Sequence, residues 1–305
     1  MYSKIETTEG TRNHAPGSRV STKNTLGTIL RRWEERGRSE HCQPPSEIAE
    51  IIRLPVWPDT LRGVPNGVLR SALFGAIRRG PRCQITRELI SSVDGYEIRY
   101  TGARLDQSDL DVWETLLHLA RLQALGNRIE TTERALLKSL DRTYGKSGRE
   151  WLKKVIARLT ATAVEFRHSK QTYGGSLVDE FYRDETLGCY VLVLNPQIQK
   201  LFAKDDWSQI EWEQRQALRG QPLAQWLHGF YSSHADPYPL KVETLHRLAG
   251  SETKLLKNFR HELRQALVLL DAVTKWRSSI DANDLVSVRK IPTKSQKRHL
   301  KKNKK

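Results

Sequence analysis

One pattern of expected elements occurs twice in this chain of 305 residues, and it limits what the chain can fold into. Each copy begins with an amphipathic helix, continues with a short helix and a longer basic helix, and ends with β-type runs. The first copy lies near residues 108–195 and the second near residues 222–291. This order of elements is typical of a winged-helix domain. We therefore expect an α+β fold with two tandem winged-helix domains.

The elements of the first copy are predicted from the spacing of apolar residues. Residues 109–122 carry apolar side chains on one side, as a helix with one buried face requires. Residues 132–140 begin on a threonine with Glu133 in the first turn, a typical helix N-terminus. The other expected elements are a basic helix at 149–163 and β-type runs at 164–167, 177–182 and 189–194.

The second copy repeats the shape of the first rather than its residues, because identity between the copies is weak. Trp113 and Trp226 occupy similar places in the first helix of each copy. The expected elements are helices at 222–234, 242–249 and 252–273, followed by strands at 275–280 and 285–290.

The segments outside the two copies differ from them in composition. Proline and glycine interrupt the lead-in, where we expect a short helix at 68–77 and strands within 89–100 joined at Asp94-Gly95. A short helix at 195–202 and a strand at 207–212 are expected between the copies. The predicted organisation is a mostly disordered arm at 1–45 with a short helix at 24–36, a lead-in with the first winged-helix domain at 46–195, a bridging segment at 196–221, the second winged-helix domain at 222–291 and a basic tail at 292–305.

The charge of the chain favours a polyanionic partner. The formal net charge is +16, and nucleic acid is the commonest partner of so basic a protein. Residues 294–305 contain seven Lys and Arg and no acid, so we expect them to form an extended tail. The sequence lacks a long apolar run and a secretory signal, and its three cysteines are too few and too scattered for a disulfide framework. A soluble protein of a reducing cytoplasm, without membrane contact, is expected.

The second basic helix is the clearest candidate for contact with DNA. One side gathers apolar residues, namely Leu255, Leu256, Phe259, Leu263, Ala266, Leu267 and Leu270. The other side gathers Lys254, Lys257, Asn258, His261, Arg264 and Gln265, with no acid among them. An ordinary solvated face normally mixes both signs of charge. Amide, imidazole and guanidinium groups pair with base edges and phosphates, so this face favours the reading of a DNA groove.

The first basic helix offers a similar but less regular surface. We expect Lys146 and Ser147 in the turn before it, and Arg149, Lys153 and Lys154 on its exposed side, to contact DNA. The alternative is that these charges only confer solubility. The hairpin at 165–182 carries basic residues and a Gly-Gly tip, so Arg167 and Lys170 are predicted to lie on a wing that touches DNA. That pattern also suits any exposed hairpin.

Signals of an enzyme are weak, so we expect neither catalysis, nor a cofactor, nor a bound metal. Gly145-Lys146-Ser147 is similar to the end of a phosphate-binding loop, but Leu140 stands where that motif needs a glycine. His228 and His234 are spaced to lie on different sides of a helix, where packing explains them better than metal binding. A transcriptional repressor and a nicking relaxase are two functions that such a DNA-binding protein could have.

Several motifs resemble the TrfA family of plasmid replication initiators. They are residues 54–62 (Leu-Pro-Val-Trp-Pro-Asp-Thr-Leu-Arg), Pro65-Asn66, 70–74 (Arg-Ser-Ala-Leu-Phe), 100–102 (Tyr-Thr-Gly), 158–163 (Arg-Leu-Thr-Ala-Thr-Ala) and 232–244 (Ser-Ser-His-Ala-Asp-Pro-Tyr-Pro-Leu-Lys-Val-Glu-Thr). The resemblance implies binding to the repeated sequences, or iterons, of a double-stranded plasmid origin. It also implies origin opening, control by a monomer–dimer equilibrium, and recruitment of host DnaA and the replicative helicase. The polymerase sliding clamp is a further implied partner, although residues 46–52 replace the Gln/Leu/Phe peptide expected to bind it.

Overall fold

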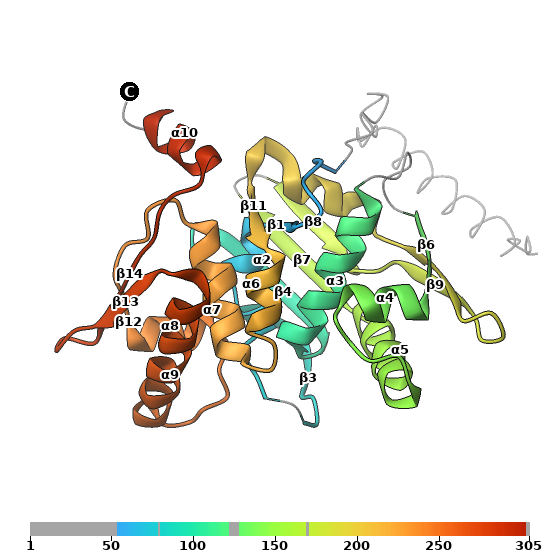
Figure 1. The fold of residues 1–305 in the computed structure, drawn as a ribbon, viewed down its shortest axis with the longest axis horizontal. Helices are drawn as coiled ribbons and strands as arrows, with labels where there is room; N and C mark the ends of the chain where they lie inside the picture. Colours follow the sequence, from blue (N-terminus) through green and yellow to red (C-terminus); the bar gives the residue numbers. More distant parts are fainter. Residues whose placement is uncertain (1–53, 79, 122–127, 169–170, 303–305) are drawn as a thin grey trace, which may run out of the picture. The chain divides into compact units, whose positions relative to one another are not determined.

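The computed structural model describes residues 54–78, 80–121, 128–168 and 171–302. The predicted arm at 1–45 and its helix at 24–36 lie outside the described residues, as do residues 46–52 and Lys170. The described part of the chain is mixed α+β and carries two winged-helix domains (Figure 1).

The first winged-helix domain contains three helices and a three-stranded sheet. Its elements are α3 (Gln107–Ala120), β6 (Arg128–Thr132), α4 (Glu133–Ser139), α5 (Lys146–Thr160), β9 (Glu180–Asp184) and β10 (Cys189–Val193). The strand order is β6-β10-β9, with all pairs antiparallel. The hairpin β9–β10 is the wing of this domain.

Local hydrogen bonds explain where the first two helices of this domain begin. The Asp106 carboxylate accepts the backbone N–H groups of Ser108 and Asp109, and the Asp109 carboxylate accepts the Asp106 N–H in return. This reciprocal pair is a capping box at the start of α3. Thr132 Oγ1 accepts the N–H of Ala135 at 3.1 Å, so the helix start predicted at Thr132 is confirmed.

The second winged-helix domain repeats this topology. Its elements are α7 (Pro222–Ser233), β12 (Leu240–Lys241), α8 (Val242–Leu248), α9 (Leu256–Thr274), β13 (Arg277–Ile280) and β14 (Leu285–Arg289). The strand order β12-β14-β13 matches β6-β10-β9, element for element. The repeat of shape expected from the sequence is therefore present in the fold.

The hairpin that was predicted to be a wing belongs instead to a four-stranded antiparallel sheet. The sheet has the order β3-β4-β7-β8 and consists of β3 (Gln84–Ile90), β4 (Tyr96–Ala103), β7 (Ala163–His168) and β8 (Gln171–Gly175). The turn at Asp94-Gly95 is confirmed, and both residues have positive φ, 61° and 76°. The prediction that the hairpin at 165–182 is a wing is wrong, because β7 pairs with β4 and buries Val164 and Phe166. That partner strand lies about 65 residues earlier in the chain, beyond the reach of a local pattern.

Short elements connect the lead-in with the bridging segment. They are β1 (Leu61–Pro65), α2 (Asn66–Leu69), β2 (Phe74–Gly75), β5 (Leu105–Asp106), η1 (Pro196–Asp205), β11 (Trp207–Glu211) and α6 (Trp212–Ala217). β1 pairs with β11, and β2 pairs with β5. The helix predicted at 68–77 is wrong: α2 ends at Leu69, and the backbone N–H of Ala76 instead donates to Ala249 O at 2.7 Å.

The end of the described chain is a helix, so the extended tail predicted there is wrong. α10 (Lys294–Lys302) begins with a reciprocal cap, in which Thr293 Oγ1 accepts the Gln296 N–H and Gln296 Oε1 accepts the Thr293 N–H. The Gln296 amide also donates to Ser232 O at 2.8 Å, at the end of α7. Both interactions depend on Gln296, a neutral residue that a prediction based on charge alone does not take into account.

Two separate hydrophobic cores support the two domains. The larger contains Trp113 and the lead-in, and the smaller contains Phe259 and the remainder of the second winged-helix domain. None of the helices in the described ranges is long and apolar enough to cross a membrane.

Candidate nucleic-acid interface

The two sides of α9 differ as the sequence predicted, with one exception. Phe259, Leu263 and Leu270 are completely buried. The exposed side contains Lys257, Asn258, His261, Arg264 and Gln265. Leu255 is the exception: it is the N-cap residue, and 62% of it is exposed. Because α9 starts at Leu256, Lys254 precedes the helix and is exposed there.

Nearby acids are paired in ways that leave the exposed side of α9 basic. Glu262 accepts hydrogen bonds from Arg78 at 2.8 Å and from Thr253 at 2.9 Å. Arg260 Nε donates to Asp284 at 2.8 Å, which joins the turn of the wing β13–β14 to the helix. Among the described residues no side chain caps the start of α9, and its first turn has no acid. The exposed N–H groups there and the helix dipole together favour an anion such as phosphate.

α5 presents a second basic surface. Lys146, Ser147, Arg149 and Lys154 are exposed, whereas Lys153 donates a hydrogen bond to Glu150 at 3.0 Å. The helix begins three residues earlier than predicted, so Lys146 and Ser147 belong to its first turn. Gly145 is the N-cap, and within the described chain no side chain caps it. α5 therefore offers free N–H groups beside its first two predicted contact residues.

The turn before α5 contains an aromatic residue, Tyr144, that was not among the predicted contact residues. Tyr144 is 48% exposed, and the guanidinium groups of Arg134 and Arg149 lie 5.9 and 5.7 Å from its ring centre. Arg142 stacks at 3.5 Å over Trp151. The sequence does show a tyrosine between arginines immediately before a helix, which could have indicated this residue. Only the fold, however, places Arg134 of α4 beside the same ring.

The residues predicted on the wing do not join this surface. Arg167 lies on β7 and forms an ion pair with Glu97 of β4 at 3.6 Å. Neighbouring Arg87 pairs with Glu165, so both signs of charge alternate across this sheet. Lys170 lies outside the described residues. The actual wing β9–β10 turns through Glu185 and exposed Leu187, and is acidic and apolar rather than basic.

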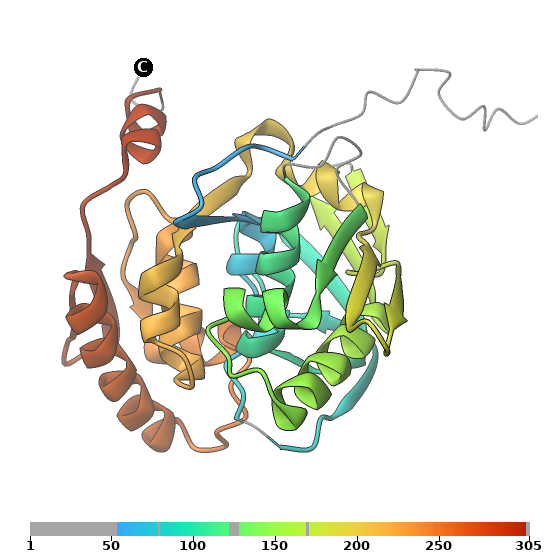
Figure 2. The same cartoon turned by 45° about the vertical axis from the view of Figure 1, so that its right-hand side comes forward.

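α5 and α9 lie on the same side of the two-domain body, at the lower edge in Figure 1 and Figure 2. Between the domains is a cavity of about 750 Å³. Arg78, Arg142 and Arg219 line it together with Asp106, Asp111 and Glu262. The cavity carries charges of both signs, so the basic surface is formed by α5 and α9 and not by the residues that line the cavity.

The histidines considered for metal binding are packing residues. His228 is completely buried, and burial lowers its pKa to about 3. Burial also lowers the pKa of His234, to about 4. In the part of the chain that the structure describes, no three His, Cys, Asp or Glu side chains are placed to hold a metal ion.

The protein therefore belongs to the class of tandem winged-helix proteins, in which each domain presents a basic third helix on the same side. A family profile described as TrfA protein matches residues 47–290. The plasmid replication initiator protein TrfA of Escherichia coli is 33% identical over 221 residues, which are 69% of this chain and 56% of that protein. The chain therefore belongs to the TrfA family, and it spans a little over half the length of that relative.

Two solved structures were compared with this fold. A crystal structure of domains 2 and 3 of RctB has a TM-score of 0.51 at 12% identity, covering 74% of this chain and 96% of that one. A crystal structure of the Pi initiator protein in complex with iteron DNA has a TM-score of 0.45 at 10% identity, covering 66% of this chain and all of that one. The first of these likenesses supports the tandem winged-helix architecture.

Proposed function

We propose that this protein is a plasmid replication initiator that binds specific sequences in double-stranded DNA. The observation that carries the proposal is the pair of uncapped basic helices, α5 and α9, on one side of a body that repeats the winged-helix topology. Membership of the TrfA family and the net charge of +16 support the same reading.

Each helix is suited to a different part of DNA recognition. The major groove of B-DNA admits an α-helix, and amide or guanidinium side chains discriminate base edges there. Asn258 and Arg264 on α9 are groups of that kind, whereas Lys146 and Lys154 on α5 are better suited to phosphate. Two such helices on one side would occupy successive major grooves, about 34 Å apart along the duplex.

The finer parts of the proposal follow from the family. Binding to iterons would be followed by opening of an adjacent AT-rich segment and by recruitment of host DnaA and the replicative helicase. A monomer–dimer equilibrium would control the amount of active protein. We propose no catalytic step, cofactor or metal for this chain.

Nuclease footprinting on the DNA that flanks the gene tests the proposal. We expect protection of direct repeats beside an AT-rich stretch, and permanganate reactivity of thymines in that stretch when the protein is bound. Protection without permanganate reactivity would favour a transcriptional repressor instead. A covalent protein–DNA adduct formed with a divalent metal would favour a relaxase. Absence of any protected sequence would contradict specific DNA binding.

A further inference from the structure

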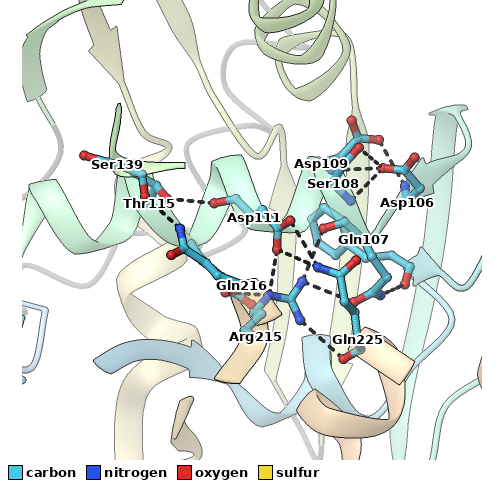
Figure 3. A network of polar contacts seen from close by, with 12 residues as sticks. Asp106, Gln107, Ser108, Asp109, Asp111, Thr115, Ser139, Arg215, Gln216 and Gln225 are labelled. Atoms are coloured by element: carbon cyan, nitrogen blue, oxygen red, sulfur yellow. Dashed lines mark hydrogen bonds and ion pairs between the residues drawn. The ribbon is translucent and has the colours of Figure 1, made fainter. Parts of the chain in front are cut away.

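The guanidinium group of Arg215 is at the centre of a buried polar network (Figure 3). It comes from α6, between the two winged-helix domains, and is completely buried. Nε donates to Asp111 Oδ1 at 2.7 Å, and Nη2 donates to the backbone and side-chain oxygens of Gln107, both at 3.2 Å. Glu114 Oε2 lies 3.1 Å from Nε. Arg215 is therefore attached to α3, the first helix of the first winged-helix domain.

The same side chain reaches the first helix of the second domain. Nη1 of Arg215 donates to Gln225 O on α7 at 3.4 Å. The Gln225 amide donates in turn to Asp111 Oδ2 at 3.3 Å. The first helices of the two domains, α3 and α7, are thus joined through one guanidinium and one carboxylate, as Figure 3 shows.

Two further residues near the end of α6 contact the segment that leads into α5. Gln216 Nε2 donates to Ser139 O at 3.3 Å, and Arg219 Nη1 donates to Leu140 O at 3.1 Å. Ser139 and Leu140 are the last residue and the C-cap of α4. α6 also contacts α9. We call Arg215, Gln216 and Arg219 the interdomain bridge.

The hydrogen bonds of the interdomain bridge can fix the orientation of one domain relative to the other. The hydrophobic cores of the two domains are separate, and a hydrophobic contact is not directional. A guanidinium, by contrast, presents its N–H groups in a rigid planar fork. Other polar contacts, such as Trp226 Nε1 to Ser71 O at 3.1 Å, also join the second domain to the lead-in. Loss of the bridge would therefore loosen the orientation of the domains without separating them.

We propose that the interdomain bridge holds α5 and α9 at a fixed separation, so that the protein accepts only DNA in which its two contact segments have one spacing. This inference rests on the proposed function for its DNA target. Rigid connection of two binding modules raises the effective concentration of the second module at a matching site and lowers it at a mismatched one. Arg215, Gln216 and Arg219 are therefore positioning residues, which act through α5 and α9.

Distance measurement between spin labels tests the bridge without DNA. Labels are placed at Ala157→Cys on α5 and Ala272→Cys on α9, both exposed, in a full-length chain whose Cys42, Cys83 and Cys189 are replaced by serine. Double electron–electron resonance should give one narrow distance distribution. Arg215→Lys should broaden it, because lysine keeps the charge but loses the fork. Gln216→Ala with Arg219→Ala, at partly exposed and exposed positions, should also broaden it and provides a variant at low risk of unfolding.

Arg158→Lys is the matched control. Arg158 forms a similar two-point pair with buried Asp109, at 3.1 and 2.7 Å, but both residues belong to the first winged-helix domain. This variant should keep the narrow distribution. A narrow distribution in both bridge variants, with folding confirmed by circular dichroism, would overturn the proposal.

DNA binding then tests the consequence. The probes are duplexes carrying the repeat found by footprinting, either intact or with about five base pairs inserted between its two protected segments, which is half a helical turn. The unmodified protein should prefer the intact repeat by about a hundredfold or more. In the bridge variants this preference should fall by at least about tenfold, whereas Arg158→Lys should keep it. An unchanged ratio in the bridge variants would also refute the proposal, whereas binding to neither probe would refute the proposed function and leave the distance measurement to decide the bridge.

Discussion

Phe259 and Leu255 are four residues apart at the start of α9, yet their surroundings are opposite. Phe259 is completely buried, with its ring 4.7 Å from that of His246, whereas Leu255 is 62% exposed. Replacing Phe259 with alanine should lower the free energy of unfolding by about 3–5 kcal/mol, because a large cavity remains. Leu255→Ala should change it by no more than about 0.5 kcal/mol. Chemical denaturation of both variants measures the difference, and equal effects would show that α9 packs in another register.

The exposed residues of α9 should differ in what they contribute to binding. Asn258→Ala and Arg264→Ala should lower affinity for the repeat and weaken the preference for one or two base pairs by about 1–3 kcal/mol each. Lys257→Ala should weaken binding to every sequence evenly, since contact with a phosphate carries no sequence information. Affinities for repeat and scrambled duplexes measure this, with thermal melting as the folding control. If Asn258→Ala and Arg264→Ala both keep the full preference, α9 does not read the repeat.

At the scale of elements, α10 has a definite position relative to the proposed DNA surface. α10 lies at the upper edge in Figure 1 and Figure 2, across the body from α5 and α9. Its exposed cations include Lys294, Lys297, Arg298 and Lys301. These are neighbours at i,i+3 and i,i+4 spacing, where like charges repel one another. A polyanion that neutralised them would therefore stabilise the helix.

Replacing these four cations with glutamine should affect long DNA more than short DNA. Because α10 lies across the body from α5 and α9, we expect a duplex that covers one repeat to bind without contacting α10, so affinity for it should be unchanged. A duplex of several hundred base pairs can bend back or bind a second protein, so affinity for it should fall, with a smaller salt dependence by about 0.9 per lost phosphate contact. Fluorescence anisotropy on both lengths at several salt concentrations measures this. An equal loss on the short duplex would place α10 at the same DNA segment as α9.

At the scale of the whole molecule, the buried carboxyl group of Glu114 beside the interdomain bridge should make the stability of the protein depend on pH. Burial, together with neighbouring Asp111, raises the pKa of Glu114 to about 7, although Arg215 and Arg62 oppose the shift. In the unfolded chain this carboxyl titrates near 4.5. Between these two values the folded protein keeps a proton that the unfolded chain has lost, so this group's contribution to stability declines as pH rises from about 4.5 to about 7.

Glu114→Gln removes this titration and keeps the shape of the side chain. Relative to the unmodified protein, the variant should gain about 2–3 kcal/mol of stability between pH 5 and pH 8. Arg215 should keep its bond to Asp111 in the variant, because Glu114 takes no part in that bond. Glu130→Gln, at an exposed position, is the control and should show no such gain. Denaturation curves at both pH values measure the difference, and a constant difference would mean that Glu114 is ionised at both.

Local patterns were sufficient to predict most helices and the exposed sides of α5 and α9. Helical periodicity and capping residues act within a few positions along the chain, so Thr132, Phe259 and Lys257 could be assigned from the sequence. The repeated order of elements was likewise sufficient for the α+β class and the tandem winged helices.

Other features depended on residues far apart in the sequence, and only the tertiary structure decided them. β7 pairs with β4 rather than forming the wing, because the fold offers Phe166 a buried surface built from an earlier strand. Arg215 was not among the residues selected from the sequence, and it is completely buried because α3 and α7 enclose it in the fold. Burial and long-range hydrogen bonding are properties of the assembled chain, so no short window of sequence contains them.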